Sequence, residues 1–315
     1  MNGIGTIERS QGCLLGQLAG DSLGSLVEFQ TPEQIQYQYP YPEGVRFLAD
    51  GGTFNTIAGQ PTDDSEMALS LARMLIDKKS YYPEDAKKSY QYWLSTMPFD
   101  CGTTVRKGLN NTPDCNSQAN GALMRIAPLG IFGVNYQLQQ VAHWAKQDAS
   151  ITHPNIVCRQ VNALFTMAIA YSIKNGVDNN TLYKKITSWA YNMKAEKVII
   201  DTIHLAESRQ PSDYIHHQGW VLIAFQNALY QLLHASGVEE GIVDSIMQGG
   251  DTDTNAAICG ALLGSVYSKK AIPQQWIDSL LNCRPEEGHS HIHHPRPTCF
   301  WPVDVMEIAE NLITA

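Results

Sequence analysis

The chain lacks an uninterrupted apolar run long enough to span a membrane. Its first apolar stretch, Gly12 to Phe29, is interrupted by polar and acidic side chains. The second, Ala256 to Tyr267, is only about a dozen residues long, whereas a bilayer crossing needs roughly 20. No basic segment precedes the first stretch, so we expect no signal peptide. These absences predict a cytoplasmic protein with no membrane partner.

Cysteine and basic side chains are too few or too scattered for several other classes of protein. The seven cysteines are odd in number and never form Cys-x-x-Cys, which indicates reduced thiols rather than disulfide bridges or a zinc ribbon. The 22 lysines and arginines are outnumbered by 31 aspartates and glutamates, which gives a net charge of -9. Because affinity for nucleic acid depends on clustered basic residues, we expect no nucleic-acid partner.

Alternating patterns typical of β-strands are missing as well, and the chain shows helical periodicity instead. Apolar residues recur at intervals of three and four, the spacing of one face of an α-helix. No repeat, low-complexity tract or Ser/Gly linker divides the chain, so we predict a single all-α domain over residues 1–315. The helical runs are residues 15–27, 67–75, 161–173, 221–233 and 304–312. Loops rich in proline, glycine or asparagine are expected at residues 38–60, 98–120, 175–180 and 284–302.

The first helical run carries a stripe of glycine. Glycine falls at every fourth position, at Gly12, Gly16, Gly20 and Gly24. Each of these residues costs about 1 kcal/mol relative to alanine in a helix interior, and close approach of a second backbone would justify that cost. The helix expected after Gly250 repeats the pattern at Gly260 and Gly264. We therefore predict that these two helices pack tightly at the centre of the fold.

Acidic residues cluster at the start of that second helix. The segment Gly249-Gly250-Asp251-Thr252-Asp253-Thr254-Asn255 places two carboxylates and two hydroxyls in a glycine-initiated turn. Such side chains cap helix N-termini, but they are also the hard oxygen ligands that Mg2+ and Mn2+ prefer, and the residue types leave both interpretations open. An EF-hand is excluded, because Ala256 and Leu262 stand where that loop needs glycine and glutamate.

Two further acidic clusters lie nearer the N-terminus. The run Thr-Asp-Asp-Ser-Glu at residues 62–66 precedes an amphipathic helix, and Asp63 with Glu66 would make a fair capping box. Asp21 and Glu28, seven residues apart, are expected on one face of the glycine-striped helix, beside the buried stripe. Because a buried carboxylate is costly without a partner, a shared cation would relieve several of them at once.

Taken in order along the chain, these clusters resemble the ADP-ribosylglycohydrolase family, the proteins like dinitrogenase reductase-activating glycohydrolase. Any single motif would be weak, but the ordered set is highly specific and covers nearly the whole chain. The matching segments are GCLLGQLAGDSLGSLVE at residues 12–28, TDDS at 62–65, NGALMRIAP at 120–128, TH at 152–153 and GGDTDT at 249–254.

The resemblance implies a compact orthogonal bundle of helices with two metal ions, Mg2+ or Mn2+, at the bottom of a cleft that binds ADP-ribose. It implies that Asp253 bridges the ions. Glu28 would lie beside them, either binding through a water or activating it. The metal ligands that the resemblance implies are Thr62, Asp63, Asp64, Asp251, Asp253 and Thr254.

The resemblance also implies which residues hold the substrate. His153 would lie near the distal ribose, and Trp220 near the adenine or the same ribose. Asp100, in the segment 98–104, matches an aspartate that faces the scissile bond in the arginine-directed branch of the family. The loop around the phosphates and ribose would contain Asn116, Ser117, Asn120, Gly121 and Ala122.

The activity implied is that of an ADP-ribosyl-arginine hydrolase, an N-glycosidase acting on an ADP-ribosylated protein. The ions would orient the ribose hydroxyls and lower the pKa of a water, while Glu28 or Asp100 takes its proton. The same site could act on a serine, O-acetyl-ADP-ribose or nucleobase linkage, and the loop around Asp100 would discriminate between them. The alternative outside catalysis is an immunity protein that binds and neutralises an ADP-ribosyltransferase toxin. We expect a monomer.

A histidine-rich run, HSHIHH at residues 289–294, departs from these motifs. Its imidazoles could bind Zn2+ or Ni2+ adventitiously. Because the run lies in a proline-rich stretch before the last helical run, we expect an exposed polar loop.

Overall fold

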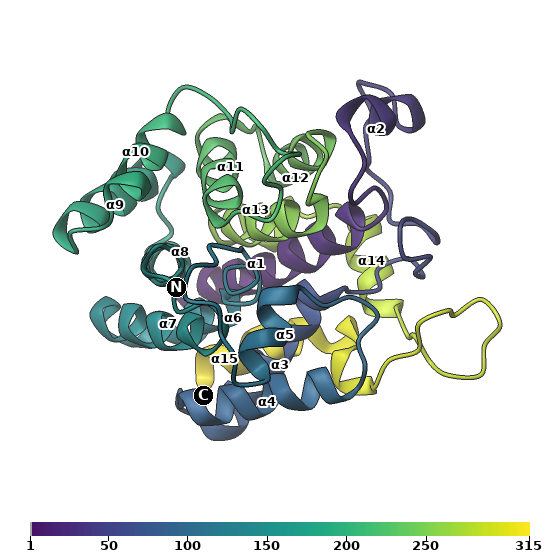
Figure 1. The fold of residues 1–315 in the computed structure, drawn as a ribbon, viewed down its shortest axis with the longest axis horizontal. Helices are drawn as coiled ribbons and strands as arrows, with labels where there is room; N and C mark the ends of the chain where they lie inside the picture. Colours follow the sequence, from purple (N-terminus) through teal and green to yellow (C-terminus); the bar gives the residue numbers. More distant parts are fainter. Residues whose placement is uncertain (1) are drawn as a thin grey trace.

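Two helices rich in glycine pack along each other at the centre of the molecule (Figure 1). They are α1 (Asn2–Gly24) and α13 (Thr252–Tyr267), in a computed structural model that describes the backbone of residues 2–315 and the side chains from residue 5 onward. A Cβ atom added at Gly16 or at Gly260 would collide with the backbone of the other helix. The predicted pairing of these two helices is confirmed.

The described residues 2–315 form fifteen α-helices and four short 3-10 helices, η1 to η4. They contain no strand, only two isolated bridges, so the predicted all-α class is confirmed. The other α-helices are α2 (Pro32–Gln38), α3 (Asp63–Lys78), α4 (Pro83–Ser95), α5 (Thr103–Leu109), α6 (Ala127–Phe132), α7 (Leu138–Thr152), α8 (Ile156–Asn175), α9 (Asn179–Asn192), α10 (Lys197–Leu205), α11 (Val221–His234), α12 (Val238–Met247), α14 (Gln274–Asn282) and α15 (Val305–Thr314). The 3-10 helices are Gly133–Asn135, Lys269–Ala271, Thr298–Phe300 and Pro302–Asp304.

The other helices surround the central pair. Helices α11 and α12 pack on α13, α15 packs on α1, and α8 packs on both members of the pair. Helices α9 and α10 lie at the periphery (Figure 1). By length and composition α8 could cross a membrane, but 83% of its most apolar 18-residue window is buried within the protein. Its apolar character is therefore that of a core helix.

The first helix ends earlier than the sequence predicts. The carbonyl oxygen of Gly24 accepts hydrogen bonds from the Thr252 hydroxyl at 2.7 Å and from the Val27 amide at 3.0 Å. The chain therefore turns away after Gly24, and Glu28 lies in the turn that follows. The prediction that Glu28 shares a helix face with Asp21 is wrong.

Two of the predicted loops contain short helices. Helix α5 lies within residues 98–120, and a 3-10 helix lies within residues 284–302. The histidine-rich run is largely exposed, as expected, but His294 is partly enclosed. Its Nε2 lies 2.8 Å from the Phe54 carbonyl oxygen, and its ring stacks on Phe99 with centroids 4.5 Å apart. This loop therefore packs on Phe99, the residue that precedes Asp100.

Candidate metal and substrate site

A cavity of about 410 Å3 opens where the C-terminal end of α1 meets the N-terminal ends of α3 and α13. The turn after α1 contributes one carboxylate, the N-terminal ends of α3 and α13 contribute two each, and the segment before α5 adds another. The acidic residues that line the cavity are Glu28, Asp63, Asp64, Asp100, Asp251 and Asp253. Segments far apart in the sequence thus bring six carboxylates to one place.

Most of the site residues predicted from the sequence line this cavity, and five do not. The other predicted residues that line it are Asn120, Gly121, His153 and Thr254. Those that lie outside the lining are Thr62, Asn116, Ser117, Ala122 and Trp220. The roles assigned to both groups stay predictions.

The Trp220 side chain lies in an adjoining open groove of about 720 Å3, which shares Ala119, Gln218 and Gly219 with the cavity. Its indole Nε1 donates a hydrogen bond to the Gln118 side chain at 2.9 Å, which fixes the ring beside the groove. A long ligand could therefore extend from the acidic cavity into this groove.

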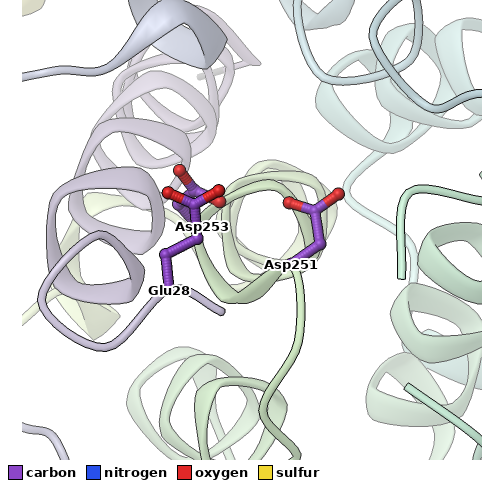
Figure 2. A group of neighbouring side chains, drawn as sticks. All are labelled: Glu28, Asp251 and Asp253. Atoms are coloured by element: carbon purple, nitrogen blue, oxygen red, sulfur yellow. The ribbon is translucent and has the colours of Figure 1, made fainter. Parts of the chain in front are cut away.

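Three of the carboxylates are close enough to share one cation. Glu28, Asp251 and Asp253 each place an oxygen within 4.8 Å of the others. Figure 2 shows the carboxylates of Glu28 and Asp253 side by side, with that of Asp251 turned toward the same space. Clustered carboxylate oxygens are the donor set that Mg2+ and Mn2+ prefer.

Unsatisfied oxygens and raised pKa values show that this cluster lacks positive charge. Glu28 Oε2 and Asp64 Oδ1 are buried without a hydrogen-bond partner among the described residues. Burial, followed by repulsion from Asp251 and Asp100, raises the pKa of Glu28 to about 9. Burial and the charge of Glu28 likewise raise the pKa of Asp253 well above its ordinary value. A divalent cation would satisfy these oxygens and offset the repulsion, so the residues fit a metal.

Helix capping does not account for the acids. Asp251 and Thr62 occupy the N-cap positions of α13 and α3, but neither side chain makes a capping hydrogen bond. Glu66 pairs with Arg296 instead of reaching back to the start of α3. The capping box predicted for Asp63 and Glu66 is therefore wrong.

Asp21 supports the site from behind and does not line the cavity. Its carboxylate accepts hydrogen bonds from the Thr62 amide at 3.1 Å, the Thr62 hydroxyl at 2.8 Å and the Ser65 amide at 3.1 Å. Burial raises its pKa to about 6, although these donors oppose the shift. Asp21 thus fixes the first turn of α3, which carries Asp63 and Asp64.

Two contacts orient other cavity carboxylates. Asn120 Nδ2 donates a hydrogen bond to Asp251 Oδ2 at 2.6 Å, and the Asn120 amide donates to the Gly219 carbonyl at 2.9 Å. The Gly102 amide donates to Asp63 Oδ2 at 3.3 Å. The loops on either side of the cavity are thereby tied to the acids that they enclose.

His153 lies in the cavity wall as a neutral imidazole. Burial, with a smaller contribution from the charge of Arg125, lowers its pKa to about 3. Its Nδ1 lies 2.7 Å from the Thr152 hydroxyl, which also accepts a hydrogen bond from Arg125 at 2.9 Å. Its Nε2 is buried without a partner among residues 2–315. The histidine is thus held by a buried network behind the wall.

The cavity is also lined by residues that the sequence does not predict as site residues. They are Phe29, Gly102, Thr103, Thr104, Val105, Ala119, Met124, Gln218 and Gly219. Phe29 directly follows Glu28, and Gln218 and Gly219 directly precede Trp220, so adjacency was the available signal. Met124 lies within the matching segment 120–128, whereas Val105 gave no signal, since an apolar residue in a helical pattern is expected in a core.

The fold and the cavity together define an all-helical protein with an acidic centre suited to divalent cations. The sequence profile of the ADP-ribosylglycohydrolase family matches residues 3–309, and the chain belongs to this family. The resemblance drawn from the motifs is thereby confirmed.

Known proteins of this family are similar over most of their length. The chain is 27% identical over 290 residues to the ADP-ribosyl-[dinitrogen reductase] glycohydrolase of Rhodospirillum rubrum, covering 89% of this chain and 92% of the relative. It is 26% identical over 296 residues to the ADP-ribosylarginine hydrolase Tri1 of Pseudomonas putida, covering 87% and 74%. A solved structure described as an ADP-ribosylglycohydrolase-related protein complex shares the fold, with a TM-score of 0.79, 22% identity and 98% coverage of both chains.

Proposed function

We propose that the protein is a metal-dependent hydrolase that removes ADP-ribose from modified protein side chains, arginine in the first place. The observation that carries the proposal is the convergence of six carboxylates on one cavity, with buried oxygens that no residue of the described chain satisfies. Membership of the ADP-ribosylglycohydrolase family supports the reaction. The relative named as an ADP-ribosylarginine hydrolase supports the arginine linkage.

Glu28, Asp251 and Asp253 would hold a divalent cation, and Asp63, Asp64 and Thr254 would supply further oxygens around a second one. Bound Mg2+ or Mn2+ supplies Lewis acidity, which lowers the pKa of a water and orients hydroxyl oxygens. The Thr62 hydroxyl donates to Asp21, so only its lone pairs remain available for a ligand role.

Polar groups of the cavity wall would position the rest of the substrate. The Gly121 amide makes no hydrogen bond within residues 2–315 and is free to donate to a phosphate oxygen. The adjoining groove with Trp220 would receive the far end of an ADP-ribose that has its reacting ribose over the acids. His153 offers a neutral imidazole nitrogen and adds no charge.

Asp100 would act on the departing group. It lines the cavity but lies outside the three-carboxylate cluster. A guanidine leaves readily only as its protonated form, and a carboxylate beside it keeps the proton on the departing nitrogen. Glu28 Oε2, buried without a hydrogen-bond donor, can accept the proton of the attacking water. The cleaved bond joins the ribose carbon to nitrogen, and that carbon gains the water oxygen.

The test is release of ADP-ribose from ADP-ribosyl-arginine in the presence of Mg2+ or Mn2+. The parent protein should turn over, and Asp253→Ala should lose more than roughly 100-fold in rate, because loss of a metal ligand exceeds the 10- to 100-fold cost of an outer-shell change. Asp100→Asn should slow turnover with metal content unchanged. No release by the parent protein would overturn the proposal, and toxin binding that survives Asp253→Ala would favour the immunity alternative.

A further inference from the structure

Phe29 combines exposure with a position at the acidic cavity. Its side chain is 57% exposed, and it lines the cavity next to Glu28. The other large hydrophobic side chains exposed in the described part of the chain do not line this cavity. Exposed aromatic side chains are common on protein surfaces, but this one lines a polar cavity, where a bound ligand can contact its ring.

The backbone of Phe29 is held in an unfavourable conformation. Its φ of 66° is left-handed, which is costly for a residue with a Cβ atom. Two backbone hydrogen bonds maintain it: the Phe29 amide donates to the Gly250 carbonyl at 2.8 Å, and the Gly250 amide donates to the Gln30 carbonyl at 3.0 Å. These hydrogen bonds join the turn that carries Phe29 to the turn that carries Asp251. Strain retained in this way is characteristic of functional positions.

The surroundings of the ring favour a planar cation. The acids of the cavity attract positive charge, and an aromatic face attracts the same charge through its quadrupole. A guanidinium is planar, always charged and stacks on aromatic rings. A serine linkage presents neither a plane nor a charge at that point, and an acetyl linkage is planar but uncharged. The acidic cavity and the aromatic ring of Phe29 therefore both favour a guanidinium as the departing group.

We propose that Phe29 determines linkage specificity by stacking its ring on the guanidinium of the departing arginine. The inference rests on the proposed function, since it assumes that ADP-ribose lies over the acids and that the acceptor side chain leaves through the mouth of the cavity. It assigns to a single side chain the choice between arginine and other acceptors.

The experiment compares Phe29→Leu, which keeps an apolar side chain without a π face, with Phe29→Tyr, which keeps the ring. With ADP-ribosyl-arginine peptide, Phe29→Leu should lose about 5-fold in kcat/KM, and Phe29→Tyr should retain the parental value. With ADP-ribosyl-serine peptide the three proteins should be alike. Equal losses on both substrates, or no loss on either, would overturn the inference. Tyr191→Ala, which removes an equally exposed ring (54%) outside the cavity, is the control.

A binding measurement separates this inference from the proposed function. Agmatine, a guanidinium probe, is titrated calorimetrically into protein loaded with ADP-ribose, so that no turnover is needed. The parent protein should bind it about 5-fold more tightly than Phe29→Leu. If the parent protein cleaves neither peptide, the proposed function fails. The ratio of agmatine affinities still tests the role of the ring, because equal binding by the parent protein and Phe29→Leu would overturn the inference.

Phe29→Gly tests whether the strained backbone is kept for the sake of the ring. Glycine relieves the left-handed strain, so the thermal midpoint should rise by about 2 °C while the preference for arginine-linked substrate is lost. Lys79→Gly is the matched control, since Lys79 has a φ of 52° at the exposed end of α3 and does not line the cavity. Lys79→Gly should gain similar stability and keep the preference for arginine-linked substrate. If Phe29→Gly also keeps this preference, the ring does not determine it.

Discussion

Two acids on the first turn of α3 are both buried, yet their surroundings are opposite. Glu66 is 1% exposed and forms a two-point ion pair with Arg296, at 2.7 and 2.8 Å, while Trp93 donates to it at 2.8 Å. Asp64 is fully buried, leaves Oδ1 without a partner and has Asp21 as a repelling neighbour. A carboxylate that is buried beside a cationic side chain, as in Glu66, is satisfied within the fold. A carboxylate that is buried without one, as in Asp64, indicates a place for a ligand.

The same distinction holds elsewhere in the molecule. Asp148 and Arg125, both with fully buried side chains, are paired at 3.2 Å behind the cavity wall. The acids of the cavity have no such partner among the described residues. Burial raises the pKa of Glu66 too, but there the hydrogen bond and charge of Arg296 oppose the shift, whereas neighbouring carboxylates add to it at Glu28 and Asp253. The protein thus contains buried acids whose removal would leave a buried cation unpaired, and buried acids that repel one another until a cation binds. Each experiment below acts on one kind and leaves the other unchanged.

The largest effect is expected from breaking the paired kind. Glu66→Ala leaves the Arg296 guanidinium buried without its carboxylate and should lower the free energy of unfolding by about 3–5 kcal/mol. Denaturant unfolding measures this loss. Asp304→Ala, which breaks a more exposed pair with Arg73, is the control and should cost less than about 1 kcal/mol. If Glu66→Ala loses no more free energy of unfolding than Asp304→Ala, the buried pair is not distinguished from an exposed one.

The second largest effect is expected from metal binding, which should act on the unpaired acids of the cavity alone. Mg2+ or Mn2+ at a hundred times its dissociation constant should raise the free energy of unfolding by about 2.7 kcal/mol relative to protein treated with chelator. Asp253→Ala should lose this response, and Asp304→Ala should keep it. The measurement is thermal unfolding with and without metal; an undiminished response in Asp253→Ala would place the cation elsewhere.

The smallest effect is expected from removing one repelling charge. Asp64→Asn should stabilise the metal-free protein by about 1 kcal/mol, the usual scale of a single substitution, because it removes a buried carboxylate that Asp21 and Asp251 repel. The gain should grow as the pH rises above about 4, the ordinary pKa of aspartate in an unfolded chain, because the unfolded chain then ionises while the raised pKa keeps the folded carboxyl protonated. Unfolding of chelated protein across pH tests this. Glu66→Gln, which neutralises the paired acid, should destabilise under the same conditions.

The sequence was sufficient where a pattern directly reflects a contact. Glycine at every fourth residue has one economical cause, the approach of another backbone, and Gly16 and Gly260 do pack against each other. Helical periodicity likewise predicted the all-α class. The order of the acidic motifs predicted which segments would surround one cavity, and Asp63 and Asp251 both line it.

The sequence was insufficient where the outcome depends on a distant partner. Glu28 lies outside the first helix, where the Gly24 carbonyl accepts a hydrogen bond from the Thr252 hydroxyl instead of from the next turn of helix. These two residues are 228 positions apart. Glu66 suggested a local capping box, yet its partner is Arg296, 230 residues away. A local pattern identifies an acid as suited to capping, pairing or metal binding, and the fold determines which of these it does.

The packing of α1 against α13 has a consequence for biosynthesis. Gly24 and the residue that ends its helix are 228 positions apart, so at about 5–20 residues per second the first helix leaves the ribosome about 10–50 seconds before its partner. During that interval its glycine face has no helix to pack against, and Glu28 has no Asp253 beside it. Any activity of the growing chain has to wait for its last quarter, and the newly made first helix is the segment that a chaperone would have to shield.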